Sequence, residues 1–487
     1  SAFSNEVLAT PRTVPDAPTG LTGTAGHTQV ALSWTAPVSN GGTAITDYVV
    51  QRSTDGTTWT TLIDGVSTVT AYTATTLTNG TTYHFRVAAI NAAGTSAFST
   101  PALATPVGPP GSPTGPAANP GNAEIALTWT APVSNGGTAI TDYTIQRSTD
   151  GTTWTTLTDG VSTVTTYTVT ALTNGTTYQF RVAAINTVGV SGFSTVVLAT
   201  PRTVPDAPTG LTGTAGNTQV ALSWTAPSSN GGVAITDYVV QRSTDGTTWT
   251  TLVDGVNTAT TYTATTLTNG TTYQFRVAAI NAAGTSAFSN VVLATPRTVA
   301  SAPTSVAGAP GSTEVALTWS APLFDGGAAI TDYVVEYSLD GATWTTLVDG
   351  VSTLANHTVS GLTNGTTYHF RVSALNAAGA GPTSVAALLT PRTTPSAPTS
   401  IVGTAANHQI ALIWTAPGFD GGAPITDYTI QLSTDGSTWT TVTDDVSTIT
   451  TFTITGLVNG TPYALRVAAT NVAGSSPFST SGNATPV

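Results

Sequence analysis

Histidine is the side chain best suited to acid–base catalysis or metal binding near neutral pH. The chain of 487 residues holds five of them, which are His27, His84, His357, His369 and His408. Only His84 and His369 occupy equivalent places in the repeating pattern described below, and both places fit the polar side of a strand. A repeated metal site would need the same ligands in every copy. The histidines therefore predict a solvated surface, with no catalytic residue.

The acidic and glycine-rich segments predict no cofactor or metal either. Asp47, Asp55 and Asp64 recur singly at turns, without the clustered spacing of a calcium-binding loop. Calcium at the boundaries between repeats remains an alternative with little support. The Gly41-Gly42 pair lies in a loop between two strands and does not precede a helix, so it is not a phosphate cradle. With no cysteine in the chain, thiolate sites and disulfides are excluded.

Two repeated motifs could present a binding surface. Asn79-Gly80-Thr81 matches the N-glycosylation pattern, and it equally fits a tight turn with glycine at positive φ, which we favour. The second motif is a predicted two-residue hairpin at Asp55-Gly56, which would place Arg52 directly opposite Trp59. That pairing predicts a cation–π contact. Trp59 then either seals the rim of the domain, which we favour, or serves as a glycan platform or a lateral contact.

These motifs belong to a repeat that runs through the whole chain. All ten tryptophans fall into two series with a constant step of 95 residues, which are Trp34, Trp129, Trp224, Trp319 and Trp414, and Trp59, Trp154, Trp249, Trp344 and Trp439. A fixed period indicates tandem copies of one unit. At this length each copy can bury its own core, so the period predicts five consecutive domains.

Each unit reads as a set of short strands. Val30, Leu32 and Trp34 alternate with polar or small residues, which is the pattern of a half-buried strand. Turn signals such as Asn79-Gly80 follow at short intervals, and no segment has helical periodicity. Seven such strands in about 95 residues predict an antiparallel β-sandwich.

The unit closely resembles the fibronectin type III domain. The resemblance is carried by Trp34, by the Ala36-Pro37…Gly41-Gly42…Ile45-Thr46-Asp47-Tyr48 stretch, by Leu77 to Tyr83, and by the Val87 to Gly94 run. It implies a seven-stranded immunoglobulin-like β-sandwich for each unit. With the constant period and the short junctions, we expect an all-β chain of five tandem seven-stranded immunoglobulin-like β-sandwiches in an extended rod. The resemblance also implies that Tyr83 and its counterparts bond their hydroxyl groups to nearby backbone.

The period sets the expected domain boundaries. Residues 1–11 match the end of a unit and are predicted to be the orphan last strand of a preceding repeat. A window cut from a longer array explains them best, and completion of a sandwich in a neighbouring chain is the alternative. The five repeats then span 12–106, 107–201, 202–296, 297–391 and 392–487. Proline-bearing junctions between them predict stiff joints.

Composition limits the function. The net charge of −12 disfavours nucleic acid, and no apolar run is long enough to span a membrane. Only 7% of the residues are charged, and cysteine, methionine and lysine are absent. We interpret the chain as a non-enzymatic, extracellular or cell-surface structural array of bacterial type, without cofactors. It is expected to be part of a longer surface or filament-forming protein that self-associates or acts as a stiff spacer. The expected partners are copies of itself and cell-surface glycans. The alternatives are the spacer of a secreted polysaccharide-degrading enzyme and the stalk of a cell adhesin.

Overall fold

Alternating apolar and polar residues build the strands, as repeat 3 illustrates. In β17 (Gln219–Thr225), Val220, Leu222 and Trp224 are buried, while the residues between them are exposed. In the long central strand β21 (Tyr273–Asn281), Phe275 is completely buried. Because successive side chains of a strand point to opposite faces, one face of each sheet becomes apolar and packs against the other sheet.

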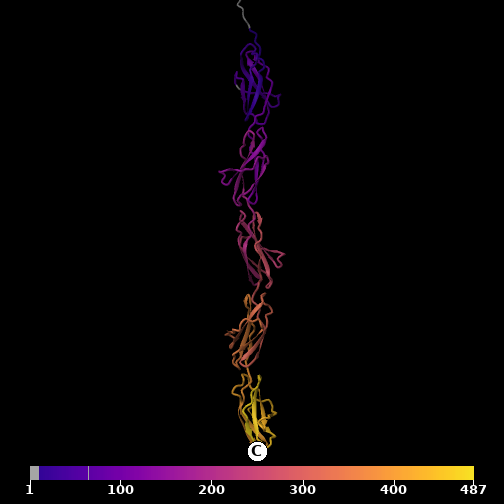
Figure 1. Ribbon diagram of the computed structural model, residues 1–487, viewed down its shortest axis with the longest axis vertical. Helices are drawn as coiled ribbons and strands as arrows, with labels where there is room; N and C mark the ends of the chain where they lie inside the picture. The colour runs from indigo at the N-terminus through magenta and orange to yellow at the C-terminus, as the bar shows by residue number, and fades with distance from the viewer. Residues whose placement is uncertain (1–9, 64) are drawn as a thin grey trace, which may run out of the picture.

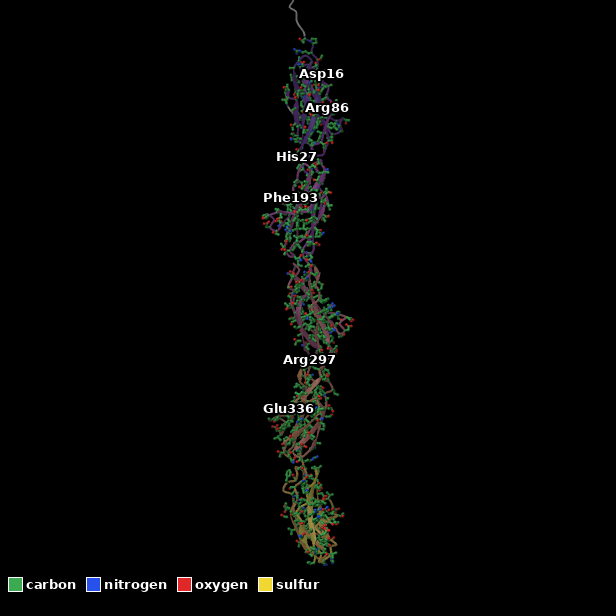
Figure 2. The ribbon with its side chains drawn as sticks, viewed as in Figure 1. Asp16, His27, Arg86, Phe193, Arg297 and Glu336 are labelled. Carbon is green, nitrogen blue, oxygen red and sulfur yellow. The ribbon has the colours of Figure 1, made fainter. Side chains whose placement is uncertain are left out.

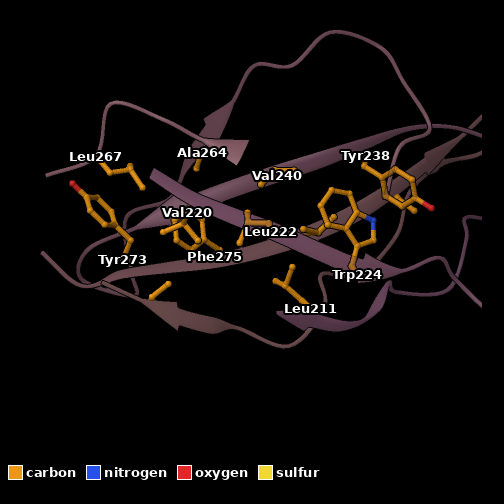
Figure 3. Close-up of a cluster of buried hydrophobic side chains, with 13 residues drawn as sticks. Leu211, Val220, Leu222, Trp224, Tyr238, Val240, Ala264, Leu267, Tyr273 and Phe275 are labelled. Carbon is orange, nitrogen blue, oxygen red and sulfur yellow. The ribbon is translucent and has the colours of Figure 1, made fainter. Parts of the chain in front are cut away.

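Two antiparallel sheets enclose one core in each repeat. Figure 3 shows the core of repeat 3. In repeat 3 the first sheet has the order β16-β17-β20 and the second has the order β19-β18-β21-β22, with β23 also pairing with β21. The last strand is therefore divided into two pieces, β22 and β23, on the same neighbour. Trp224 lies in the core with its ring edge-on to Tyr238, at a centroid distance of 5.4 Å and an interplanar angle of 66°.

The strand bounds repeat closely along the chain. Repeat 1 contains β1 (Thr19–Gly26), β2 (Gln29–Thr35), β3 (Ile45–Ser53), β4 (Thr60–Thr61), β5 (Ala71–Ala74), β6 (Tyr83–Asn91), β7 (Gly94–Thr95) and β8 (Ala102–Ala104). Repeat 2 contains β9 (Thr114–Pro120), β10 (Ile125–Thr130), β11 (Ile140–Ser148), β12 (Thr155–Thr156), β13 (Thr166–Val169), β14 (Tyr178–Asn186) and β15 (Val197–Ala199). Repeat 3 contains β16 (Thr209–Gly216), β17, β18 (Ile235–Ser243), β19 (Thr250–Leu252), β20 (Thr261–Ala264), β21, β22 (Gly284–Thr285) and β23 (Val292–Ala294).

The last two repeats follow the same plan. Repeat 4 contains β24 (Thr304–Pro310), β25 (Glu314–Ser320), β26 (Ile330–Ser338), β27 (Thr345–Thr346), β28 (Asn356–Ser360), β29 (Tyr368–Asn376), β30 (Gly379–Ala380) and β31 (Ala387–Leu389). Repeat 5 contains β32 (Thr399–Ala406), β33 (Gln409–Thr415), β34 (Asp427–Ser433), β35 (Thr440–Thr441), β36 (Thr451–Thr455), β37 (Tyr463–Asn471), β38 (Gly474–Ser475) and β39 (Gly482–Ala484). In repeat 2 a single bridge, Ile185–Val190, replaces the short strand seen elsewhere.

The computed structural model describes residues 10–63 and 65–487, and its five sandwiches stand end to end along one axis (Figure 1). Repeats 2 and 3 project side loops to opposite sides of this axis (Figure 1). The prediction of an all-β chain of five sandwiches in an extended rod is thus confirmed. The predicted orphan strand over 1–11 falls almost entirely outside the described residues.

Candidate functional site

The five histidines lie in separate surroundings. His84 and His369 stand on strands β6 and β29, opposite Leu103 and Leu388. His357 pairs with Asp349 through Nδ1 and Oδ2 at 3.3 Å, and His408 Nδ1 lies 2.9 Å from the Leu457 carbonyl oxygen. His27 lies in the turn between β1 and β2, at the end of the sandwich that faces repeat 2. Within residues 10–63 and 65–487, no three histidine, aspartate or glutamate side chains lie close enough to hold a metal ion together.

The aspartate of each Asp-Gly turn caps its own loop, because its carboxylate accepts hydrogen bonds from the loop backbone and from a serine hydroxyl. In repeat 3, Asp245 Oδ1 accepts the backbone N–H of Thr248 at 2.7 Å and of Thr247 at 2.8 Å, and the hydroxyl of Ser243 at 2.9 Å. The two backbone donors are the main reason that the pKa of Asp245 lies well below its usual range. The same cap lowers the pKa of its counterparts Asp55, Asp150, Asp340 and Asp435.

This cap makes stability depend on pH in one direction. A carboxylate with a lowered pKa in the folded state stabilises the fold above about pH 4, and this contribution is lost as the pH falls further. We expect the thermal unfolding midpoint, followed by circular dichroism, to fall between about pH 5 and pH 2. Burial raises the pKa of Asp159 and Asp444, which opposes the trend, but five caps outnumber these two groups.

The matched control for this prediction replaces the five capping aspartates by asparagine. Asparagine keeps an acceptor oxygen in the same place but does not titrate. The acid-induced drop in the midpoint should shrink in this variant. An identical drop in the variant and the wild type would contradict the assignment.

The predicted contact between Arg52 and Trp59 is wrong. Arg52 pairs with Thr60, one residue beyond the expected position, because the connecting loop is longer than a two-residue hairpin turn. A shift of one residue moves every side chain to the opposite face. Trp59 accordingly lies half-buried on the outer face of the sheet, with Arg86 over its ring at 4.0 Å from the centroid. Arg52 lies 5.8 Å from the Tyr83 ring instead.

Each repeat thus carries an arginine stacked on its outer sheet face. In repeat 3, the Arg276 guanidinium lies 3.9 Å from the Trp249 centroid and 4.0 Å from the Phe288 centroid, between the two rings. Its Nε and Nη2 both donate to Gln241 Oε1, at 2.9 and 2.8 Å. In repeat 4 the pattern changes, because Thr383 stands in the place of the phenylalanine. There Arg371 Nε forms an ion pair with Glu336 Oε2 at 2.7 Å.

We expect Arg276→Lys to destabilise repeat 3 by about 1–2 kcal/mol. Lysine cannot stack as a plane between two rings or donate twice to one amide oxygen. The matched variant is Arg371→Lys, because Arg371 stacks on Trp344 alone and lysine can keep the ion pair with Glu336. Denaturant-dependent hydrogen exchange, resolved by repeat, measures both losses. A loss in repeat 4 as large as that in repeat 3 would refute the role of the two-ring stack.

The Asn-Gly motif forms the predicted turn. Gly80 has a φ of +80°, and the Asn79 side chain is engaged, with Oδ1 accepting the Thr28 N–H at 2.8 Å. The tyrosine that follows this turn bonds as the resemblance implied. The Thr78 N–H donates to Tyr83 Oη at 3.1 Å, and the equivalent bonds in the other four repeats are 3.1 to 3.2 Å long.

The same turn meets the Gly-Gly loop of the next repeat. At the junction of repeats 2 and 3, a Cβ atom added to Gly175 would lie 3.1 Å from Gly232 Cα. A Cβ added to Gly232 would overlap the Gly175 nitrogen and lie 2.7 Å from the Asn174 carbonyl carbon. The two turns therefore approach backbone to backbone, and glycine is required on both sides. The same contact joins Gly80 with Gly137, Gly270 with Gly327, and Gly365 with Gly422.

Backbone hydrogen bonds attach each linker to both of its neighbours. In the linker after repeat 2, the Pro201 carbonyl accepts the Gly175 N–H at 2.9 Å, and the Arg202 N–H donates to the Gly121 carbonyl at 2.9 Å. The next residue, Thr203, donates its N–H to the Gly231 carbonyl of repeat 3 at 2.8 Å. The corresponding bonds at the other three junctions are 2.8 to 3.1 Å long.

A buried asparagine completes each junction. The Asn281 Nδ2 group donates to the Thr203 carbonyl of the linker at 2.8 Å and to the Asn230 carbonyl of the glycine loop at 2.7 Å. Asn186, Asn376 and Asn471 make the equivalent pair of bonds at the other junctions. We define the junction as the Asn-Gly turn, the linker, the Gly-Gly loop and this asparagine. Sequence reasoning found the two glycine motifs separately, and their strict recurrence was the only signal that they belong together.

The comparisons with known proteins agree with this architecture. The family model "Fibronectin type III domain" matches residues 16–105, 111–200, 206–295, 301–388 and 396–485. The chain is 30% identical over 505 residues to fibronectin type-III domain-containing protein 3a of Gallus gallus, across 98% of this chain and 41% of that protein. It is 28% identical over 169 residues to the M-protein of striated muscle of Gallus gallus, across 33% of this chain and 12% of that protein.

Two further similarities are more limited. Protein sidekick-1 of Mus musculus is 31% identical over 176 residues, across 34% of this chain and 8% of that protein. The crystal structure of the chicken CNTN1 FN1-FN3 domains matches at 24% identity with a TM-score of 0.28, covering 59% of this chain and all of that one.

These relatives bear on two of the expectations from sequence. They are animal proteins, so they lend no support to a bacterial type. None of the three curated relatives carries the name of an enzyme, and the chain spans about two fifths of the length of the first. Since the family model covers most of the sequence and the sandwiches have the expected topology, the chain belongs to the fibronectin type III family.

Proposed function

We propose that this chain is a non-enzymatic structural array that acts as a stiff spacer within a longer extracellular or cell-surface protein. The observation that carries the proposal is the junction, which recurs at all four boundaries with the same glycine contact and the same linker bonds. A linker bonded to both neighbours cannot bend without breaking these bonds. Each junction therefore restricts rotation between repeats, and the restriction accumulates along the rod.

Small-angle X-ray scattering of the full chain in solution tests this proposal. A stiff spacer is expected to give the pair-distance distribution of a single extended rod, with a maximum dimension equal to five repeats end to end. The distribution should not change with temperature below the unfolding transition, because no hinge is being populated. A broad distribution with a shorter maximum dimension would indicate a flexible string and contradict the proposal.

The proposal includes association between copies of the chain, side by side or end to end. Its support is the composition: with 7% charged residues, few like charges oppose the approach of two rods. Sedimentation velocity over a hundredfold range of concentration should show a species heavier than 49.0 kDa that increases with concentration. A single monomeric boundary throughout that range would remove association from the proposal and leave the spacer role intact.

A further inference from the structure

The junction between repeats 1 and 2 contains a titratable side chain in place of an amide. His27 lies in the turn between β1 and β2, at the boundary of the two repeats (Figure 2). Repeats 2, 3 and 5 have an asparagine at the equivalent place, which is Asn122, Asn217 and Asn407.

The hydrogen bonds around Asn79 make Nδ1 of His27 the acceptor in this contact. Asn79 Oδ1 accepts the backbone N–H of Thr28 at 2.8 Å, so the amide cannot be turned round without losing this bond. Its Nδ2 group consequently faces His27 Nδ1, at 3.0 Å. An amide NH₂ group only donates, so Nδ1 of His27 must accept and carry no proton.

The equivalent asparagines play the same accepting role. Asn122 Oδ1 accepts a hydrogen bond from Asn174 Nδ2 at 2.9 Å, and Asn217 Oδ1 accepts one from Asn269 Nδ2 at the same distance. Both donors belong to the Asn-Gly turn of the same repeat. An amide oxygen remains an acceptor at any physiological pH. Unlike these amide oxygens, an imidazole nitrogen can take up a proton when the pH falls, and it then no longer accepts a hydrogen bond.

His27 occupies the space next to the linker. A Cβ atom on Gly108 would overlap both His27 Nδ1 and Asn79 Nδ2. At the other three junctions this linker position is a threonine, at Thr203, Thr298 and Thr393. The larger imidazole is thus matched by the smaller glycine. Asn79 in turn precedes Gly80, whose added Cβ would lie 3.2 Å from Gly137 Cα of repeat 2.

No fixed charge compensates a proton on His27. The segments that meet at this junction are 26–29, 78–83 and 105–110, together with 131–139 and 186–190 of repeat 2. They contain no aspartate, glutamate, lysine or arginine, and Tyr83 is the only titratable side chain besides His27. Over the described part of the chain, the one arginine–carboxylate ion pair is Arg371–Glu336, in repeat 4.

We propose that His27 makes the junction between repeats 1 and 2 a pH-sensitive joint, rigid when the imidazole is neutral and loosened when Nδ1 takes up a proton. The protonated Nδ1–H group would point at the donor NH₂ of Asn79, and the ring would have to turn into the space held by the linker. The inference rests on the proposed spacer function, because it adds one controllable bend to an otherwise stiff rod.

Pulsed electron paramagnetic resonance on the full chain tests the joint. The chain has no cysteine, so Thr73→Cys and Thr168→Cys place nitroxide labels on exposed strand positions of repeats 1 and 2. We expect a narrow distance distribution at pH 8 that becomes at least twofold wider at pH 5. Labels at Thr168→Cys and Thr263→Cys, across the next junction, should give the same narrow distribution at both pH values.

The variant His27→Asn supplies the asparagine acceptor that repeats 2, 3 and 5 have at this place, so the distance distribution across its first junction should stay narrow at pH 5. Circular dichroism at pH 5 verifies that all repeats remain folded. An unchanged wild-type width at pH 5, equal broadening at both junctions, or broadening that persists in His27→Asn would each overturn the proposal. Wide distributions already at pH 8 would instead contradict the stiff spacer, so the two failures can be told apart.

Discussion

Replacing Trp224 by alanine is expected to lower the free energy of unfolding of repeat 3 by about 3–5 kcal/mol. Trp224 is 6% exposed and packs among Leu211, Leu222 and Tyr238 (Figure 3). Truncation removes a large apolar area and leaves a cavity that the surrounding strands cannot fill, since both sheets are held by their backbone bonds. Hydrogen exchange in increasing denaturant, read from peptides of repeat 3, measures the loss.

The second tryptophan of the same repeat is the control. Trp249 lies half-buried on the outer face, with Arg276 stacked on its ring and its Nε1–H donating to the Gly246 carbonyl at 3.2 Å. Trp249→Ala should therefore cost less than half as much as Trp224→Ala. Repeats 2 and 4 should keep wild-type exchange in both variants, because each repeat has its own core. Equal losses for the two tryptophans would show that the core assignment is wrong.

Gly232→Ala is expected to open the junction between repeats 2 and 3 while both sandwiches stay folded. The added Cβ atom would overlap the backbone of the Asn174-Gly175 turn, and backbone atoms cannot rotate away as a side chain can. The φ of +89° adds about 1–2 kcal/mol of strain for a residue other than glycine. Nitroxide labels at Thr168→Cys and Thr263→Cys should report a distance distribution at least twofold wider than in the parent.

Gly460→Ala is the control that separates the backbone strain of a positive φ from the loss of the glycine contact between repeats. Gly460 belongs to the Asn-Gly turn of repeat 5 and has a φ of +80°, so it incurs similar strain. A Cβ atom there meets nothing within 4 Å. This variant should slightly destabilise repeat 5 and leave every junction unchanged. If Gly232→Ala also leaves the distance distribution narrow, the glycine contact does not hold the junction, and the linker bonds alone must do so.

Local patterns were sufficient for the core. The alternation through Val30, Leu32 and Trp34 predicts a strand with one buried face, and all three side chains are buried. The prediction succeeds because the side-chain period of two is a property of the strand itself. The tyrosine at the Asn-Gly corner was likewise placed by resemblance, and Tyr273 bonds as expected. The predicted two-residue hairpin at Asp55-Gly56 is wrong, because the Asp55 carboxylate accepts the N–H groups of Thr57 and Thr58 and so stabilises a longer loop.

By itself, the sequence determined the number of domains, their β-sandwich class and the buried side of strands such as that of Val30, Leu32 and Trp34, since all of these follow from period and alternation within one repeat. Only the tertiary structure decided which contacts form between different strands and between neighbouring repeats. It placed Arg276, 27 residues away in the chain, over Trp249, and it brought the Asn-Gly turn of one repeat onto the Gly-Gly loop of the next. The physical reason is that glycine motifs in separate repeats look like independent turns until the backbones are seen to touch.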